Sequence, residues 1–120
     1  MQMSPQYSAI DRKILQRLYD LQDNADPTLV ADLIQMFFES SPRRIQQIYA
    51  SARTGDMKRV ERESHDLKSS SANLGATQMS HLAAEIEKLG RAESKEPITD
   101  CIERLKEAYE PVKQELTALL

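Results

Sequence analysis

The chain has 120 residues, of which 40% are hydrophobic, and a formal net charge of -3 that comes from 16 basic and 19 acidic residues. This length suits one domain with one core, and it is too short for a helical bundle joined to a separate catalytic domain. The charge gives no general electrostatic reason to bind nucleic acid, because proteins that bind nucleic acid tend to be basic.

Residues 1–7 contain Ser, Pro and Gln without periodicity, so we expect a frayed lead followed by one domain over residues 8–120. No stretch is apolar for long enough to cross a bilayer, and the N-terminus lacks the charged-then-apolar pattern of a secretory signal. The lone cysteine, Cys101, excludes an internal disulfide and a multi-cysteine metal site, and its place in an apolar stripe predicts a small core residue. We expect a cytoplasmic chain that does not insert into a membrane, and we expect it to act as a monomer.

The first predicted helix is short and starts near Ser8 or Asp11, either of which can cap its N-terminus. Its expected apolar face consists of Ile10, Ile14, Leu18 and Leu21. We expect this helix to pack on the outside of a bundle formed by longer helices.

A second helix is predicted to open at Pro27 with Asp26 as its N-cap, because proline suits the first helical position. Its first half is apolar almost all round, so it has to be covered on more than one side, and the first helix is the expected cover. Pro42 should bend this helix without ending it, because the apolar spacing continues as far as Ala52.

The third predicted helix runs from about Asp56 to Leu74. Gly55 ends the helix before it, Asp56 supplies its N-cap, and Gly75 is expected as its left-handed C-terminal residue. The stripe that packs against neighbouring helices consists of Met57, Val60, Ser64, Leu67, Ser71 and Leu74.

A fourth helix is expected from Thr77 to within residues 90–93, with an inward face of Met79, Leu82, Ala83, Ile86 and Leu89. The last helix starts at Pro97 and is expected to kink near Tyr109 at Pro111, since its apolar stripe keeps phase across the proline. That stripe consists of Ile98, Cys101, Ile102, Leu105, Ala108, Val112, Leu116 and Leu119. The predicted fold is therefore all-α: an antiparallel up-and-down four-helix bundle with an additional short N-terminal helix.

His65 lies off the packing stripe of the third helix, roughly 130° from its centre, and is therefore expected to be exposed. A neutral imidazole has an unprotonated ring nitrogen that can attack an activated phosphoryl group. Lys68 lies three residues further on, where its ammonium can swing toward phosphoryl oxygens. Ser69, one turn after His65, is small enough to let a partner approach.

The run His65-Asp66-Leu67-Lys68, followed by Ser-Ser-Ala-Asn-Leu-Gly-Ala at residues 70–76, resembles the signature of histidine phosphotransfer (HPt) domains of multistep phosphorelays. The resemblance extends over nearly the whole chain. It implies that His65 accepts a phosphoryl group from the aspartyl phosphate of one response-regulator receiver domain and passes it to the aspartate of another. It also implies a hybrid sensor histidine kinase as a partner, and a metal ion in the receiver, with no cofactor or metal of this chain's own.

The resemblance assigns roles to four residues. His65 is the phosphoacceptor, Lys68 steadies the phosphoryl oxygens, and Gly75 closes the helix. The family usually has Gly one turn after the histidine, where this chain has Ser69 at the border of the site. A hydroxymethyl group is small and can hydrogen-bond a phosphoryl oxygen, so we expect altered partner fit and not abolished transfer. No glycine-rich phosphate loop is present, so we expect a phosphocarrier without a nucleotide site, not an enzyme.

Positive charge is concentrated between residues 42 and 68, a segment that contains seven Lys and Arg residues and four acidic residues. Such a patch suits an acidic protein partner, although an ordinary solvated face would show the same composition. The candidate partner-binding residues are Arg43, Arg44, Lys58, Arg59 and Arg62.

The same residues allow other interpretations. His81 is expected to be a plain surface residue, and a metal site shared by His65 and His81 lacks the usual ligand spacing. The acids Glu61, Glu63 and Asp66 are interleaved with Lys and Arg at helical spacing, which favours surface ion pairs over acid/base catalysis. The main alternative function is a helical adaptor that is never phosphorylated. A self-contained enzyme is less favoured, because a small convex bundle offers no evident cleft.

Overall fold

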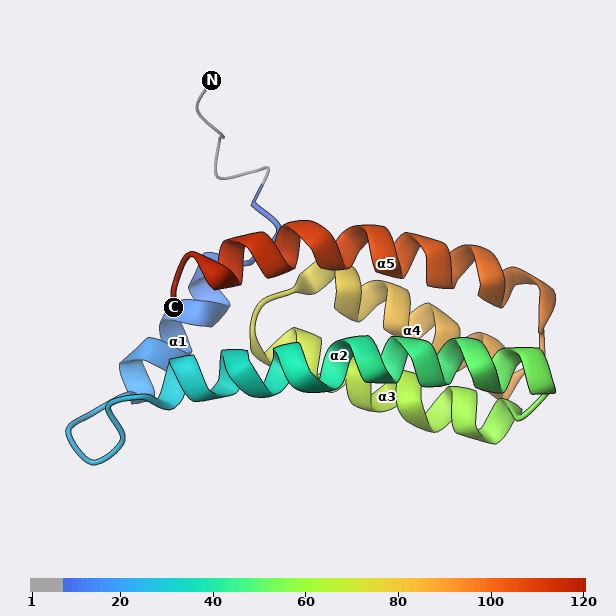
Figure 1. The fold of residues 1–120 in the computed structure, drawn as a ribbon, viewed down its shortest axis with the longest axis horizontal. Coiled ribbons are helices and arrows are strands. Elements are labelled where there is room, and N and C mark those ends of the chain that lie inside the picture. Colours follow the sequence, from blue (N-terminus) through green and yellow to red (C-terminus); the bar gives the residue numbers. More distant parts are fainter. Residues whose placement is uncertain (1–7) are drawn as a thin grey trace, which may run out of the picture.

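The computed structural model describes residues 8–120, which form five α-helices and no β-strand (Figure 1). The helices are α1 (Arg12–Leu21), α2 (Leu29–Thr54), α3 (Met57–Asn73), α4 (Thr77–Arg91) and α5 (Glu96–Thr117). The expected lead at residues 1–7 lies outside the described residues. None of the helices in the described part of the chain is long and apolar enough to span a lipid bilayer.

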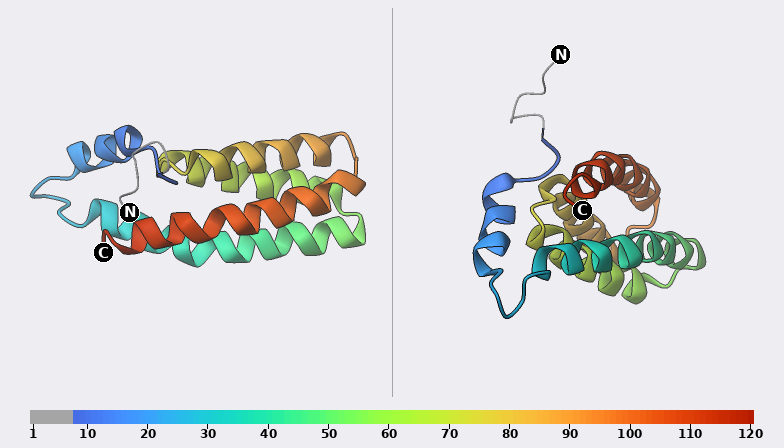
Figure 2. Two further views of the ribbon diagram at one scale, coloured as in Figure 1. Left: turned by 90° about the horizontal axis from the view of Figure 1, so that it is seen from above. Right: turned by 60° about the vertical axis from the view of Figure 1, so that its left-hand side comes forward.

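The four longer helices lie side by side, and each packs against two others in the cyclic order α2, α3, α4, α5. Consecutive helices run in opposite directions and are joined by short turns, as Figures 1 and 2 show. Helix α1 packs against α2 at the end of the bundle where the C-terminus lies (Figure 1). The prediction of an antiparallel up-and-down four-helix bundle with an additional short N-terminal helix is confirmed.

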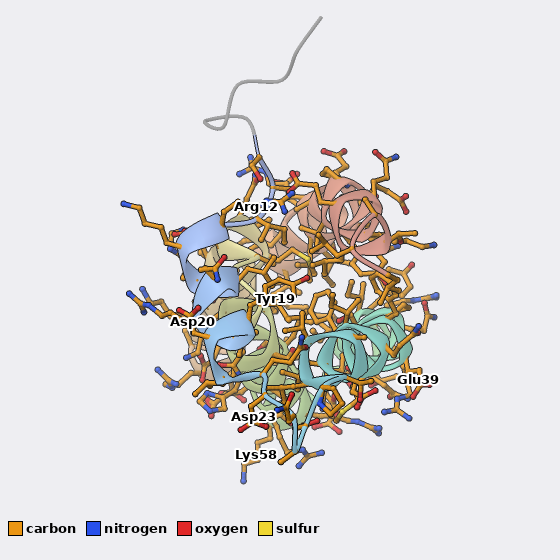
Figure 3. All side chains as sticks on the ribbon, turned by 90° about the vertical axis from the view of Figure 1, so that its left-hand side faces the viewer. Arg12, Tyr19, Asp20, Asp23, Glu39 and Lys58 are labelled. Carbon is orange, nitrogen blue, oxygen red and sulfur yellow. The ribbon has the colours of Figure 1, made fainter. Side chains whose placement is uncertain are left out.

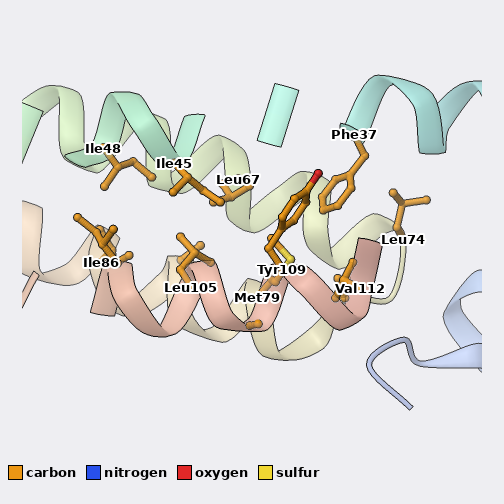
Figure 4. Close-up of a cluster of buried hydrophobic side chains, with 14 of the residues drawn as sticks. Phe37, Ile45, Ile48, Leu67, Leu74, Met79, Ile86, Leu105, Tyr109 and Val112 are labelled. Carbon is orange, nitrogen blue, oxygen red and sulfur yellow. The ribbon is translucent and has the colours of Figure 1, made fainter. Parts of the chain in front are cut away.

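The core runs along the middle of the bundle and receives apolar side chains from all four long helices (Figure 4). Phe37 of α2 meets Tyr109 of α5, with ring centroids 6.2 Å apart. Charged side chains such as Lys58 and Glu39 point outward around this core (Figure 3). The predicted stripe of α5 is buried from Ile98 to Leu116, as the periodicity required. Removal of this apolar surface from water is the main force that holds the helices together.

Both ends of α3 have the predicted residues. At its start the Asp56 carboxylate accepts a hydrogen bond from the Arg59 amide at 3.2 Å. At its end Gly75 has φ +81°, and the Ala76 amide donates to the Ser71 carbonyl at 2.9 Å. This 6→1 bond is the mark of a Schellman C-cap, in which the residue after the cap is left-handed. The direction and length of the helix that carries His65 are therefore set by local sequence.

The predicted start of α2 is wrong by two residues. Asp26 and Pro27 lie in the preceding turn, which the Asp23 carboxylate organises by accepting the Ala25 and Asp26 amides at 2.9 and 3.0 Å. The helix begins at Leu29 instead. A turn built by an aspartate side chain competes with the N-cap arrangement that the Asp-Pro pair indicated.

The apolar face predicted for α1 is also partly wrong. Its buried residue is Leu15, which the prediction omitted, whereas Leu21 is 67% exposed. The helix begins at Arg12, with Asp11 as its N-cap. Ile10 therefore precedes the helix and does not share its periodicity, so a face counted from Ile10 is out of phase.

Pro42 and Pro111 lie inside α2 and α5, and each helix continues across its proline, as predicted. Both prolines are on exposed faces. The carbonyl group that loses its helical partner four residues earlier can therefore bond to water. The inward-facing side of each helix remains intact.

The segment before α1 is joined to both α3 and α5. The Asp11 amide donates to the Gly75 carbonyl at 2.7 Å, while the Glu115 carboxylate of α5 binds the Ser8 hydroxyl at 2.7 Å and Arg12 at 3.1 Å. A Cβ atom at Gly75 would lie 2.6 Å from the Asp11 carbonyl oxygen. The turn that ends the His65 helix is thus held against the N-terminal segment.

Candidate functional site

His65 projects from α3 into solvent with 56% of its side chain exposed, in agreement with its position off the packing stripe. The buried residues of α3 are Met57, Val60, Ser64, Leu67 and Ser71. One ring nitrogen, Nδ1, lies 2.8 Å from the Glu87 Oε2 atom of α4. The other ring nitrogen, Nε2, makes no hydrogen bond to another group within residues 8–120.

Glu87 is the central acceptor of this site, and the sequence analysis did not identify it. Its side chain is only 9% exposed. Its carboxylate binds His65 Nδ1, Lys68 Nζ at 2.7 Å and Arg91 Nη2 at 3.5 Å. We call the face formed by His65, Lys68, Glu87 and Arg91 the α4 flank of α3.

A signal for Glu87 exists in the sequence. It follows Ala83 by four residues and precedes Gly90 by three, and both of those residues are buried, as are Met79 and Ile86. Glu87 therefore belongs to the inward stripe of α4, where Leu82 and Leu89 were expected and are only half-buried. A carboxylate on a buried stripe needs partners of opposite charge, so a search for such partners would have led to α3.

The hydrogen bond from Lys68 lowers the pKa of Glu87, and the hydrogen bond with His65 acts in the same direction, against the effect of burial. The carboxylate is therefore ionised at neutral pH. Because an ionised carboxylate can only accept, it draws donors from both neighbouring helices. The α4 flank thus holds one buried negative charge, with Lys68, Arg91 and the imidazole arranged around it.

Lys68 occupies the expected position beside His65 but is not a free ammonium. Its side chain is 33% exposed, and its Nζ is bound to Glu87. His65 and Lys68 are thus joined through one carboxylate, which keeps the ammonium near the ring. The expectation of a mobile charge is replaced by one that is held in place.

The serines near His65 have separate roles. Ser69 is exposed and its hydroxyl donates to the His65 carbonyl of its own helix at 3.2 Å. Ser71 is fully buried on the packing stripe, as predicted. Ser69 therefore borders the site with a short side chain whose hydroxyl is already engaged.

The acids near His65 form ion pairs, as expected, but with residues of other helices. Glu63 and Asp66 both bind Arg44 of α2, at 3.4 and 3.1 Å, and Glu61 binds Arg91 of α4 at 3.3 Å. The helical spacing indicated partners within α3. Helices α2 and α4 pack closely against α3. The acids of α3 therefore pair with arginines of those two helices and not with basic residues of α3 itself.

The five candidate docking residues come from two helices. Arg43 and Arg44 line a groove of about 520 Å³ between α1, α2 and α3, whereas Lys58, Arg59 and Arg62 lie at the start of α3. The apolar lining of the groove includes Met36, which is 62% exposed. We call this groove the α2 groove; its lining residues are Leu18, Leu33, Met36, Phe37, Glu39, Ser40, Arg43, Arg44, Ser70, Asn73 and Leu74.

The expectation that the bundle has no cleft is therefore wrong, because α1 does not fully cover the first half of α2. The α2 groove contains neither His65 nor Lys68. From α3 it is lined by Ser70 and Asn73, whereas His65 and Lys68 bind Glu87 of α4.

The remaining polar candidates stand apart from this site. His81 is exposed near the start of α4. Among residues 8–120 no group of three or more His, Cys, Asp or Glu side chains is arranged to hold a metal ion. Cys101 is buried as predicted, and burial raises the pKa of its thiol.

The sequence comparisons with known proteins all point to the same family. The sequence model of the Hpt domain matches residues 32–115. Histidine-containing phosphotransfer protein 1 of Arabidopsis thaliana is 29% identical over 112 residues, which are 92% of this chain and 72% of that protein. Histidine-containing phosphotransfer protein 5 of the same plant is 26% identical over 105 residues, covering 85% of this chain and 67% of the relative.

A solved structure has the same fold. The crystal structure of histidine-containing phosphotransfer protein B from Pseudomonas aeruginosa superposes with a TM-score of 0.84 at 20% identity. The superposition covers 93% of this chain and 94% of that one. The five-helix arrangement described above is therefore shared along nearly its entire length.

Proposed function

The chain belongs to the Hpt-domain family, and from that premise we propose that His65 is the residue that carries the phosphoryl group. The chain is a histidine phosphotransfer module of a phosphorelay, and the family works with receiver domains and kinases as a phosphocarrier. The observation that supports His65 is its geometry: an exposed imidazole with Nδ1 bound and Nε2 free, beside the Lys68 ammonium.

In the proposed step, Nε2 of His65 attacks the phosphorus atom of a receiver's aspartyl phosphate. The N–P bond forms as the acyl P–O bond breaks, and the electron pair of that bond returns to the receiver's aspartate carboxylate. The reverse step, with another receiver, passes the phosphoryl group on. A rigid helix suits this role, because phosphoryl transfer depends chiefly on positioning and charge stabilisation.

The proposal divides the remaining roles between the two proteins. Lys68 steadies the phosphoryl oxygens, and Ser69 leaves space at the border of the site. The metal ion that assists transfer belongs to the receiver's acidic pocket, and this chain needs no cofactor or nucleotide site of its own. We propose that the module acts as a cytoplasmic monomer, with a hybrid sensor histidine kinase upstream.

The α2 groove supports a place for the receiver. It offers the exposed Met36 as an apolar anchor and Arg43 as a positive charge at its edge, whereas Arg44 is already paired with Glu63 and Asp66. A receiver that presents an acidic pocket to His65 has a charge complementary to Arg43. Docking in this proposal therefore uses residues other than those of the α4 flank.

The test is phosphoryl transfer from a phosphorylated receiver domain. The wild-type chain should acquire acid-labile, base-stable phosphate, and His65→Gln should acquire none. His81→Gln is the matched control, because His81 is also an exposed histidine, and it should be labelled as the wild type is.

Label that persists on His65→Gln would refute the assignment. A wild-type chain that binds the receiver but never takes up label would instead be the helical adaptor.

A further inference from the structure

We propose that α1 is a hinged wall of the α2 groove, and that the Glu115 carboxylate is the latch that holds this wall in the position a receiver recognises. The proposal rests on docking of the receiver in the α2 groove. It gives a role in recognition to a residue of α5 that does not line the groove.

The latch is the single carboxylate of Glu115, which binds three groups at the start of α1 and in the segment before it. It accepts hydrogen bonds from the Ser8 hydroxyl at 2.7 Å, the Ala9 amide at 2.5 Å and the Arg12 guanidinium at 3.1 Å. The Glu115 side chain is 18% exposed, so these bonds are partly shielded from water. Hydrogen bonds to a charged group are stronger than those between neutral groups. The start of α1 is therefore fixed to α5 by polar contacts.

The apolar packing of α1 is limited by comparison. Among the helices, α1 packs mainly against α2, and its one buried residue is Leu15. Leu18 and Tyr19 are only partly buried against the core, and Leu21 at the end of the helix is exposed. A helix of 10 residues has little stability of its own in water. The position of α1 therefore depends strongly on the bonds at its start.

The other end of α1 leads into a connection that can serve as the hinge. Residues 22–28 join α1 to α2 and contribute no buried side chain. Their hydrogen bonds are local: Asp23 binds amides of its own turn, and Gln22 accepts the Val30 amide at 3.1 Å. None of these bonds ties α1 to α3 or α5. Once the latch is released, α1 can therefore swing about this connection.

The latched segment meets the α2 groove at two places. Helix α1 contributes Leu18 to the lining of the groove, and the end of α3 contributes Asn73 and Leu74. The Asp11 amide, just before α1, donates to the Gly75 carbonyl at 2.7 Å, directly after Leu74 in the chain. Release of the latch should therefore loosen the lining from both helices.

The consequence for the receiver is a change in affinity and not in chemistry. With the latch closed, the wall is in place before the receiver arrives, so docking costs less ordering. With the latch open, only a fraction of the molecules is ready to bind, and the apparent affinity falls by that fraction. His65 and Lys68 hydrogen-bond to Glu87 of α4, so transfer in the bound complex should keep its rate.

The first measurement follows α1 itself and needs no receiver. Hydrogen exchange of the whole chain, read by mass spectrometry, reports how often the amides of residues 12–21 open. Glu115→Ala should speed this exchange about tenfold, while α4 keeps its wild-type exchange. Ser8→Asp, which places a second carboxylate beside Glu115, should have the same effect by repulsion and leaves α5 unaltered. Glu115→Gln keeps one acceptor oxygen and should lie between the wild type and Glu115→Ala.

The second measurement is receiver affinity by isothermal titration calorimetry, paired with the transfer rate at saturating phosphorylated receiver. Glu115→Ala and Ser8→Asp should each weaken binding about fivefold, a modest coupling between separate sites. The transfer rate at saturation should equal that of the wild type. Glu107→Gln, at an exposed position of the same helix, is the matched control and should change neither exchange nor affinity.

Unchanged exchange of α1 in both Glu115→Ala and Ser8→Asp would overturn the proposal, as would faster exchange with unchanged receiver affinity. A lower transfer rate at saturation would also overturn it, because Glu115 would then act on the site of His65. Failure of the docking proposal looks different. In that case Met36→Glu binds the receiver as the wild type does, while hydrogen exchange still reports whether Glu115 holds α1.

Discussion

The two sides of α3 differ in what they present to a partner. On the α4 flank, polar groups converge on the buried carboxylate of Glu87, and the imidazole of His65 remains more than half exposed. On the side of the α2 groove, an apolar surface around Met36 is left uncovered and is edged by arginines. The difference teaches that the proposed chemistry and the proposed recognition use different residues of the same helix. Each can then be changed without the other.

The largest effect should come from the α4 flank. Lys68→Ala removes the cation nearest the phosphoryl group, and loss of one stabilising charge or donor of this kind slows a reaction about a hundredfold. The measurement is single-turnover transfer from a phosphorylated receiver, with receiver affinity measured in parallel. Affinity should change little, because Lys68 does not line the α2 groove. A loss of receiver affinity with an unchanged transfer rate would show that Lys68 serves docking and not the chemistry of transfer.

A smaller effect, on stability, is expected at the end of α3 that both sides share. Gly75→Ala has to adopt φ near +81° and places its Cβ 2.6 Å from the Asp11 carbonyl oxygen. It should lower the free energy of unfolding by about 2 kcal/mol or more. Chemical denaturation measures this.

Gly55→Ala is the matched control for that variant. Gly55 has nearly the same backbone angle, φ +82°, but no atom within 4 Å of an added Cβ. Its cost should be about 1 kcal/mol, from the left-handed backbone alone. Equal losses in the two variants would show that contact with the N-terminal segment does not matter.

The third prediction concerns the α2 groove. Met36→Glu puts a negative charge where an acidic partner is proposed to dock, and it should weaken receiver binding about tenfold, or about 1.4 kcal/mol. Isothermal titration calorimetry measures the affinity.

Leu120→Glu is the control, because Leu120 is also exposed, at 54%, and does not line the groove. If both variants bind the receiver as the wild type does, the α2 groove is not the docking surface.

The smallest effect is a change in how stability depends on pH. In the folded chain the hydrogen bond from Lys68 keeps the pKa of Glu87 below its ordinary value. As pH falls, Glu87 of the unfolded chain takes up its proton at the ordinary pKa, before Glu87 of the folded chain does. The ionised carboxylate therefore stabilises the fold fully above the ordinary pKa, and this stabilisation is lost as pH falls to the lowered pKa. Unfolding free energies from about pH 7 to about pH 3 should therefore fall more steeply for the wild type than for Glu87→Gln. Identical curves would contradict the assigned role of the carboxylate.

Much of the fold could be predicted because its signals are local. Gly55, Asp56 and Gly75 end and begin helices through backbone angles and capping bonds within a few residues. The errors arose where a side chain outside the helix intervened. Asp23 builds the turn that displaces the start of α2, and Ile10 precedes α1 and so misled the choice of its face.

The candidate site was predicted in part for the same reason. The sequence by itself determined the helices, their apolar stripes, and the exposure of His65 with Lys68 one turn away, because all of these follow from helical periodicity along one segment. Only the tertiary structure decided that Glu87 joins them and that Arg44 pairs with acids of α3, since those partners lie 19 or more residues away in the chain. It also decided that the first half of α2 stays partly uncovered, because coverage depends on where α1 packs and not on the residues of α2.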